Sequence, residues 1–314
     1  MAKRTYAFRA KTSGFLDKAE PFIQLLIYIS GWSSIIFVAA IFIFIFREAL
    51  PIIPHVDWAE FFTENNWIPN PAEGNEPKYG ALSMLYGTAA VTVLSMVMGV
   101  PMGLGAAIYI SEFAGPKMKE ILKVLIELLA AIPSIVWGFI GLVVLGPLIQ
   151  KVTGAPVGVN LLNAGIIIAL MALPLIVSIS EDALRAVPDS YREAGLALGA
   201  SRWEVIYRVL FPAARNGLLA ACMLGVGRAV GETMAVLMAS GNADKIPKSF
   251  ADPAFLTSQV KTLTATIASE MGDTAYGDEH YRMLFVIATL LLIISVVINV
   301  ISDLVVKGVK KQHG

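Results

Sequence analysis

The chain has 314 residues, of which 56% are hydrophobic and 15% charged, and its mean hydropathy is +0.70. This composition excludes an average soluble domain and indicates a polytopic membrane protein. The formal net charge of zero gives no reason to expect nucleic acid as a partner.

The sequence also lacks the signatures of several kinds of chemistry. A lone cysteine, Cys222, excludes an intrachain disulfide. The three histidines have no metal-ligand spacing, and no G-x-x-x-x-G-K-[ST] segment occurs. We therefore expect neither metal nor other cofactor in this chain, and no ATP hydrolysis by it.

The N-terminal part predicts a tail, a membrane span and an external loop. Residues 1–21 are basic, and the uncharged run that follows over residues 22–46 is too long for the apolar region of a signal peptide. We interpret the run as an uncleaved transmembrane helix. Residues 47–80, rich in proline, tryptophan and asparagine, form an outside loop.

The second span covers residues 81–110. Pro101 predicts a kink in it, and Gly99 with Gly103 has the spacing at which two membrane helices approach closely. We expect this glycine pair to serve packing.

A basic turn precedes the third span, residues 125–149. We expect Lys123 to pair with Glu127, four residues further on. Pro133 predicts a break in this helix, because proline removes a backbone hydrogen bond.

Three more spans complete an all-helical protein with six transmembrane helices. Their residues are 161–180, 213–240 and 283–302, with a polar outside loop over 241–282. Of the 24 lysines and arginines, 16 fall on the inner side of this topology and 7 on the outer side, which leaves Arg228 inside a span. This excess predicts that both termini are cytosolic.

The chain therefore divides into four parts. These are a cytosolic tail (1–21), the first helix with its extracytoplasmic loop (22–80), a core of five helices (81–302) and a cytosolic tail (303–314).

A polar segment, residues 181–212, lies between the fourth and fifth spans. Pro188 ends its first helix, and Asp189 or Ser190 is expected to cap a second, whose apolar side chains form a docking face. Gly199 ends that helix. Ser201 and Glu204 have the spacing of a capping box for a third helix, which Pro212 is expected to close.

The fifth span carries two charges, Arg228 and Glu232, in the stretch from Gly227 to Val236. A charge at the centre of a membrane helix costs about 3 kcal/mol, so both need partners or water. Four residues apart, they fall on one helical face, next to Gly227 and Gly231. Either they form a structural ion pair, or Arg228 lines a passage and binds an oxyanion while Glu232 neutralises it when the site is empty.

The polar segment resembles the EAA loop of ABC importer permeases. The resemblance is carried by Glu193, Ala194, Gly199 and Pro212, with departures at Gly195, Val209 and Phe211. In that family the loop sits in a groove of an ATPase subunit. The resemblance implies that the following residues couple to the ATPase: Arg192, Glu193, Ala194, Gly199, Arg202 and Pro212.

Three stretches together resemble the phosphate-specific ABC importer permeases. They are Ser178 to Pro188, the EAA-like loop, and Gly227 to Val236, and the likeness extends from about Tyr86 to the C-terminus. It implies the type I, MetI-like permease fold, location in the cytoplasmic membrane, and a role in phosphate import. The implied partners are a second permease subunit, a cytosolic ATPase dimer that binds ATP and Mg²⁺, and an extracytoplasmic phosphate-binding protein, besides membrane lipid.

Other functions remain open at this point. A permease for molybdate or sulfate is closely related, because a guanidinium group does not discriminate among these oxyanions. An ion-gradient-driven transporter or channel and a membrane scaffold come from different classes, and the buried charges argue against the scaffold. In the preferred interpretation, Arg228 and Glu232 form part of the substrate pathway.

Overall fold

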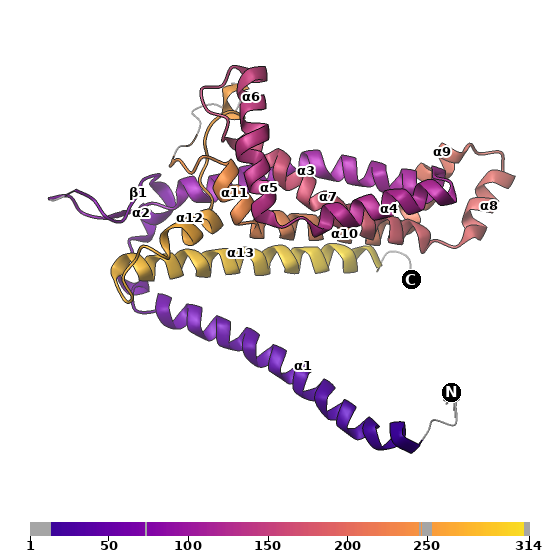
Figure 1. The fold of residues 1–314 in the computed structure, drawn as a ribbon, viewed down its shortest axis with the longest axis horizontal. Coiled ribbons are helices and arrows are strands. Elements are labelled where there is room, and N and C mark those ends of the chain that lie inside the picture. Colours follow the sequence, from indigo (N-terminus) through magenta and orange to yellow (C-terminus); the bar gives the residue numbers. More distant parts are fainter. Residues whose placement is uncertain (1–13, 73, 245, 247–252, 311–314) are drawn as a thin grey trace.

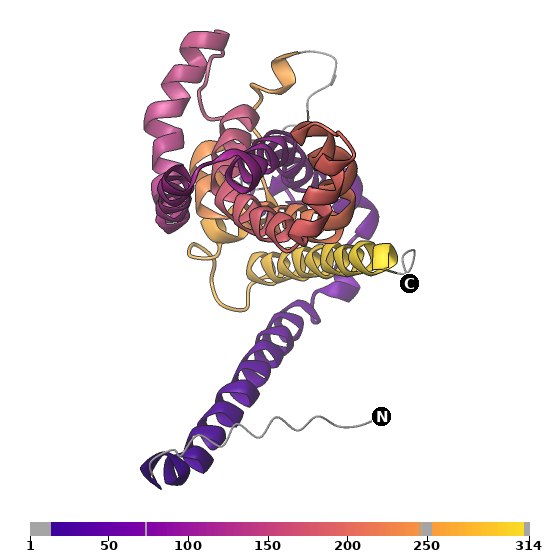
Figure 2. The same ribbon diagram turned by 90° about the vertical axis from the view of Figure 1, so that its right-hand side faces the viewer.

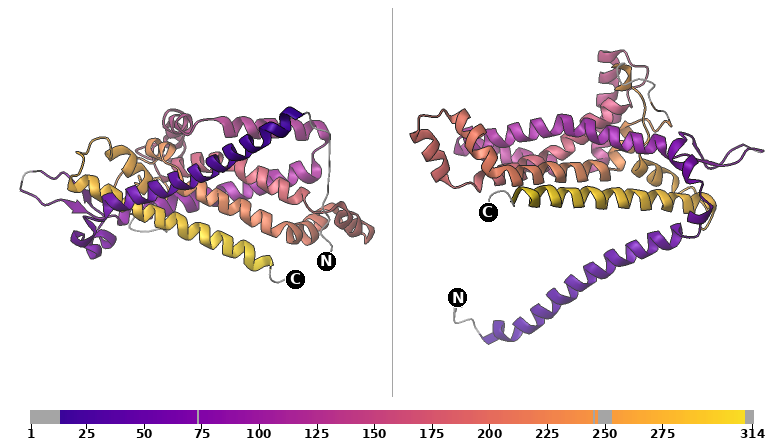
Figure 3. Two further views of the ribbon diagram at one scale, coloured as in Figure 1. Left: turned by 90° about the horizontal axis from the view of Figure 1, so that it is seen from below. Right: turned by 180° about the vertical axis from the view of Figure 1, so that it is seen from behind.

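A computed structural model describes residues 14–72, 74–244, 246 and 253–310. Four long helices run side by side and form a bundle (Figures 1 and 3). They are α3 (Leu82–Ile108), α7 (Leu161–Arg185), α10 (Phe211–Gly231) and α13 (Glu279–Lys310). The N-terminal helix α1 (Gly14–Ala49) diverges from the bundle (Figure 2). Its C-terminal end contacts α13, near the start of that helix.

Six helical stretches of the described chain are long and apolar enough to cross a membrane. The sequence predicted six spans in the same order. The stretches are Glu20–His55, Leu82–Phe113, Ser134–Thr153, Leu161–Arg185, Arg202–Gly231 and Glu279–Leu304.

Small residues bring the central helices together. A Cβ atom added to Gly99 would lie 3.5 Å from the backbone of Ala169, and one added to Gly103 only 2.6 Å from Cγ2 of Ile176. Both glycines therefore face α7, and the prediction that they serve helix packing is confirmed. Pro101 lies within α3, which continues past it.

The third span is divided at the predicted proline. Helix α4 (Pro116–Ala131) ends just before Pro133, whose backbone is extended at φ −59° and ψ 145°. The chain then turns away from the bundle axis as α5 (Ser134–Ile140), the π-helical turn η3 (Gly141–Leu145) and α6 (Gly146–Thr153) (Figures 1 and 2). The predicted basic turn is wrong, because its lysines lie on α4.

At one end of the bundle the loops are folded. The N-terminal loop holds η1 (Ile53–His55), α2 (Trp58–Thr63) and a hairpin in which β1 (Trp67–Ile68) pairs antiparallel with β2 (Lys78–Tyr79). The later loop holds η5 (Pro253–Phe255) and α12 (Leu263–Glu270), after α11 (Met234–Ala239).

A polar network ties these loops together. The Glu270 carboxylate accepts hydrogen bonds from Nε1 of Trp67 at 2.7 Å and Nζ of Lys261 at 3.1 Å, and lies 2.9 Å from Nε2 of His280. Lys261, which is 8% exposed, also lies 3.5 Å from Asp244. Burial raises the pKa of Asp244 above its ordinary value. The network joins β1 to α12 and to the start of α13.

Candidate functional site

The opposite end of the bundle carries a helical hairpin of α8 (Asp189–Ala197) and α9 (Arg202–Val205) (Figure 1). Pro188 precedes it, as predicted. Gly199 ends the first helix with φ +81°, a left-handed conformation that glycine adopts without a steric penalty. The capping box of Ser201 and Glu204 is present in both directions. The predicted helix-turn-helix geometry is therefore confirmed.

Two details of the hairpin differ from the prediction. The N-cap of α8 is Pro188, without a side-chain cap, and Asp189 is already the first helical residue. Pro212 does not close the third helix, because α9 continues through the π-helical turn η4 (Ile206–Leu210) into α10. In this turn the Phe211 N–H donates to the carbonyl of Ile206, five residues earlier. The next residue, Pro212, has no N–H and so does not need an acceptor in the helix.

Arg192 fixes the hairpin to the bundle. Its Nε and Nη2 atoms donate to the two carboxylate oxygens of Glu112 at 3.2 and 2.9 Å. Glu112 lies in the π-helical turn η2 (Tyr109–Phe113) at the end of α3. Further bonds go to the carbonyls of Leu184 and Val187. The hydrogen bond to Glu112 raises the pKa of Arg192, and the side chain is only 20% exposed.

The outer surface of the hairpin is apolar and open. The predicted docking face is exposed throughout, and Leu198 is 89% exposed. Of the residues assigned to coupling, Glu193, Ala194 and Arg202 are also exposed. Exposed apolar and aromatic side chains on this end are Tyr191, Leu196, Leu198, Trp203 and Tyr207. Such a patch, rimmed by charges, is typical of a protein interaction surface.

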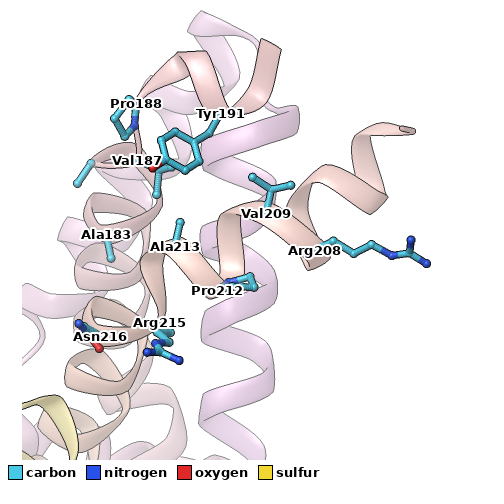
Figure 4. A pocket seen from close by; sticks show the side chains of 11 residues that line it. Ala183, Val187, Pro188, Tyr191, Arg208, Val209, Pro212, Ala213, Arg215 and Asn216 are labelled. Atoms are coloured by element: carbon cyan, nitrogen blue, oxygen red, sulfur yellow. The ribbon is translucent and has the colours of Figure 1, made fainter. Parts of the chain in front are cut away.

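Beneath the hairpin lies a cavity of about 720 Å³ between the end of α7, α8 and the start of α10. Tyr191 and Val209 lie on two sides of it, while Arg208 points outward (Figure 4). Pro212 also lines it. On its other side the hairpin is held to the bundle by Arg192 and by apolar packing, since the buried Val205 and Ile206 belong to one cluster with Ile110 of η2 and Leu184 of α7.

The two charges of the fifth span are not arranged as the sequence predicted. Helix α10 ends at Gly231, and Glu232 has an extended backbone at φ −73° and ψ 130°, before α11 begins at Met234. Arg228 and Glu232 therefore do not share a helical face, and no ion pair joins these two described residues. The carbonyl of Glu232 accepts from Thr264 Oγ1 at 2.9 Å, which holds the break in place.

Arg228 lies on the open side of the bundle. It is exposed, and it lines a cavity of about 270 Å³ together with Glu127 of α4 and Ser178 of α7. Beside it, Gly227 and Gly231 have nothing within 4 Å of an added Cβ. Within the described residues, this face of α10 is therefore uncovered at the two glycines.

The sequence analysis missed a cluster around Glu181. This carboxylate is 2% exposed and lies 2.9 Å from Nζ of both Lys119 and Lys123, and 3.5 Å from Arg185. The predicted pair of Lys123 with Glu127 is wrong, because Lys123 reaches across to α7. The sequence signals for Glu181 were its place in the Ser178 to Pro188 stretch and the i,i+4 spacing to Arg185, whereas its lysine partners are remote in the chain.

Within the described part of the chain, no group of histidine, cysteine and carboxylate side chains is arranged to hold a metal ion. The chemistry available on this side of the bundle is electrostatic: the exposed Arg228 lines a cavity, and the cationic cluster around Glu181 lies further along α7.

Comparison with protein families places residues 99–311 under the model described as binding-protein-dependent transport system inner membrane component. The chain is 43% identical over 236 residues to a probable ABC transporter permease protein YqgH of Bacillus subtilis, covering 75% of this chain and 74% of that one. It is 34% identical to the phosphate transport system permease protein PstC of Mesorhizobium japonicum, covering 81% and 80%.

Two solved structures share the fold. A chain of a bacterial ABC transporter involved in the import of alginate superposes with a TM-score of 0.61 at 13% identity, over 94% of this chain and 99% of that one. A chain of the MetNI methionine ABC transporter, in an inward-facing conformation, gives a TM-score of 0.53 at 23% identity, over 73% and 94%.

Proposed function

Because this chain belongs to the family of binding-protein-dependent transport system inner membrane components, we propose that it is a permease subunit of an ATP-driven importer of inorganic phosphate. The observation that carries the phosphate assignment is its likeness to phosphate transport system permeases of several bacteria. Three of them are 32 to 34% identical over 81 to 88% of this chain.

The helical hairpin is the contact to the ATPase in this proposal. Its exposed apolar face, with Glu193, Ala194 and Arg202, meets the ATP-hydrolysing subunit, which itself binds ATP and Mg²⁺. Gly199 sets the corner between the two helices, and Arg192 holds the hairpin against α3 through Glu112. Movement of the ATPase is thereby passed to both α3 and α10.

The open side of α10 forms half of the translocation pathway. Arg228 offers a planar, permanently charged donor group to the anion, and the uncovered Gly227 and Gly231 leave room for a second permease subunit opposite. Glu232 lies one residue beyond the end of the helix, where its charge limits how tightly an anion is held.

The orientation follows from the distribution of charge. Of the 24 lysines and arginines, 16 fall on the inner side of the predicted topology, to which the hairpin belongs, so the hairpin end faces the cytosol of a multi-pass protein in the cytoplasmic membrane. The folded loops at the other end receive the extracytoplasmic phosphate-binding protein.

Uptake of labelled phosphate by cells that express the chain with its partner subunits tests the proposal. Excess sulfate or molybdate should not compete, and Arg228→Ala should abolish uptake while the complex still assembles. Arg228→Lys, which keeps the charge but not the planar fork, should retain part of the activity. Competition by either oxyanion would transfer the assignment to that substrate, and normal uptake by Arg228→Ala would remove Arg228 from the pathway.

A further inference from the structure

Two cavities on the open side of the bundle share one wall. The cavity of about 270 Å³ beside Arg228 and a smaller one of about 70 Å³ are both lined by Ile126, Glu127 and Ser178. The smaller cavity is also lined by Lys123 and Glu181. The space beside Arg228 therefore leads toward the Glu181 cluster, in the direction of the helical hairpin.

The charge at the far end of this path is positive. Lys119, Lys123 and Arg185 surround the carboxylate of Glu181, and with Glu127, which lines the same small cavity, the group keeps one net positive charge. Glu181 is buried, whereas the Lys123 side chain is 38% exposed. An ammonium group has three donors, so Lys123 can bond to Glu181 and still donate to an anion in the cavity.

The spacing suits a transfer between two sites. Ser178 and Glu181 are three residues apart on α7, which corresponds to about 4.5 Å along the helix axis. Arg228 lines one cavity together with Pro174 and Ser178 of α7. The exposed Ser178 thus lies between the guanidinium group and the lysines, where its hydroxyl can donate to an oxyanion.

We propose that Lys123 and Ser178 form a second oxyanion-binding station, through which the transported anion leaves the Arg228 cavity toward the hairpin end. The inference rests on the proposed function. Glu181 positions the ammonium group of Lys123 and offsets part of its charge. Glu127, on the shared wall, opposes tight binding at either station, so that the anion can move on.

A purely structural cluster that only braces α4 against α7 makes a different prediction. In that case, loss of Lys123 weakens the packing of α4 but changes no interaction with an anion. A direct measurement of whether an anion lies against the wall that the two cavities share distinguishes the binding station from the structural cluster.

The probe is a cysteine in place of Ile126, which lines both cavities, in the complete complex with Cys222→Ala as background. The rate of labelling by a small uncharged maleimide is measured from the hairpin side, with inorganic phosphate or with chloride of equal ionic strength. Phosphate at about twice its dissociation constant should slow labelling roughly threefold by mass action. Lys123→Gln should abolish this protection, and Lys123→Arg should restore it.

Lys117→Gln is the matched control, because Lys117 is an exposed lysine on the same helix that lines neither cavity. Its protection by phosphate should equal that of the parent. The proposal is overturned if phosphate protects the cysteine of the Lys123→Gln variant as well as that of the parent. It is also overturned if chloride and phosphate slow the labelling equally.

Failure of the proposed function gives a different result. If the parent complex imports sulfate or molybdate in place of phosphate, the labelling is repeated with that anion. Loss of its protection in Lys123→Gln supports the station for that substrate, whereas unchanged protection overturns it.

Discussion

At the scale of single residues, two arginines of the hairpin region have different roles, although the sequence assigned both to coupling. Arg192 is bonded to Glu112 and to two backbone carbonyls, whereas Arg202 is exposed. Arg192→Ala should therefore destabilise the permease by about 2–3 kcal/mol and release the ATPase as well. Arg202→Ala should weaken ATPase binding without loss of stability.

Thermal unfolding and co-purification with the ATPase, measured on the same samples, check this prediction. An Arg192→Ala protein that unfolds at the parent's temperature would show that the bonds to Glu112 do not anchor the hairpin.

Glu270 permits a similar test at the other end of the bundle. It is the common partner of Trp67, Lys261 and His280, and Glu270→Gln would leave Lys261 buried with only the more distant Asp244. A loss of about 1–3 kcal/mol in stability is expected, seen as a lower midpoint of thermal unfolding. Asp273→Asn removes an exposed carboxylate from the same loop and should leave the midpoint unchanged.

The residues of the site differ in how readily sequence reveals them. Arg228 could be singled out from the sequence because a charged side chain in an apolar span raises the free energy of membrane insertion whatever its orientation. Glu181 was missed because its partners Lys119 and Lys123 lie about sixty residues away, and their approach depends on how α4 packs against α7. The pair of Lys123 and Glu127 was expected from their i,i+4 spacing, but Lys123 binds the buried Glu181 of another helix instead.

At the scale of elements, the packing of α8 against α9 explains one departure from the EAA pattern. An alanine at Gly195 would place its Cβ 2.8 Å from Cγ2 of Val205, so the small residue here accommodates a large one across the corner. Gly195→Ala alone should destabilise the hairpin by about 1–3 kcal/mol. Adding Val205→Ala should recover part of the loss.

A double-mutant cycle on thermal stability and ATPase co-purification measures this coupling. If the stability losses of Gly195→Ala and Val205→Ala are additive, the two positions have no interaction energy. The contact with Val205 would then not explain why position 195 is glycine.

The helix breaks show where local rules work and where they do not. Pro133 breaks the third span as predicted, because a proline inside a helix removes a hydrogen bond. Pro212 was expected to close a helix and does not, because the π-helical turn η4 directly before it carries the helix on into α10. The break at Glu232 carries no proline, and a contact from Thr264 of a distant loop holds it.

At the scale of the whole molecule, the composition and the apolar runs were enough to predict six membrane helices and their order. The divergence of α1, the turn of α5 and α6 away from the bundle and the folded outer loops were not predicted. The folded loops depend on contacts between remote segments, such as Trp67 with Glu270, which apolar periodicity does not record, whereas the apolar stretch of α1 is not buried against the rest of the described chain.

The uncovered face of α10 leads to a prediction about assembly. Gly227 has open space beside it, whereas an added Cβ at Gly225 would lie 2.9 Å from Cδ1 of Ile176 in α7. Gly227→Leu should leave the fold of this chain intact and reduce assembly with the second permease or phosphate uptake. Gly225→Leu should disturb the fold itself.

Limited proteolysis reports the fold, and co-purification and uptake report assembly and transport. A Gly227→Leu protein that assembles and transports normally would indicate that this face meets only lipid.

The π-helical turn between Val205 and Phe211 makes the connection from hairpin to bundle a matter of rotational register. A π-helical turn accommodates one residue more than an α-helical turn, and each residue of an α-helix corresponds to about 100° of rotation. Removing Val209 should therefore let the helix run on in α-helical form with α9 and α10 in their present register. Removing a residue from the α-helical part, such as Ala213, leaves no surplus residue to absorb the change and should turn α9 by about 100° relative to the rest of α10. The permease would then fold and insert but present the wrong side of its hairpin, so ATP hydrolysis and transport would become uncoupled.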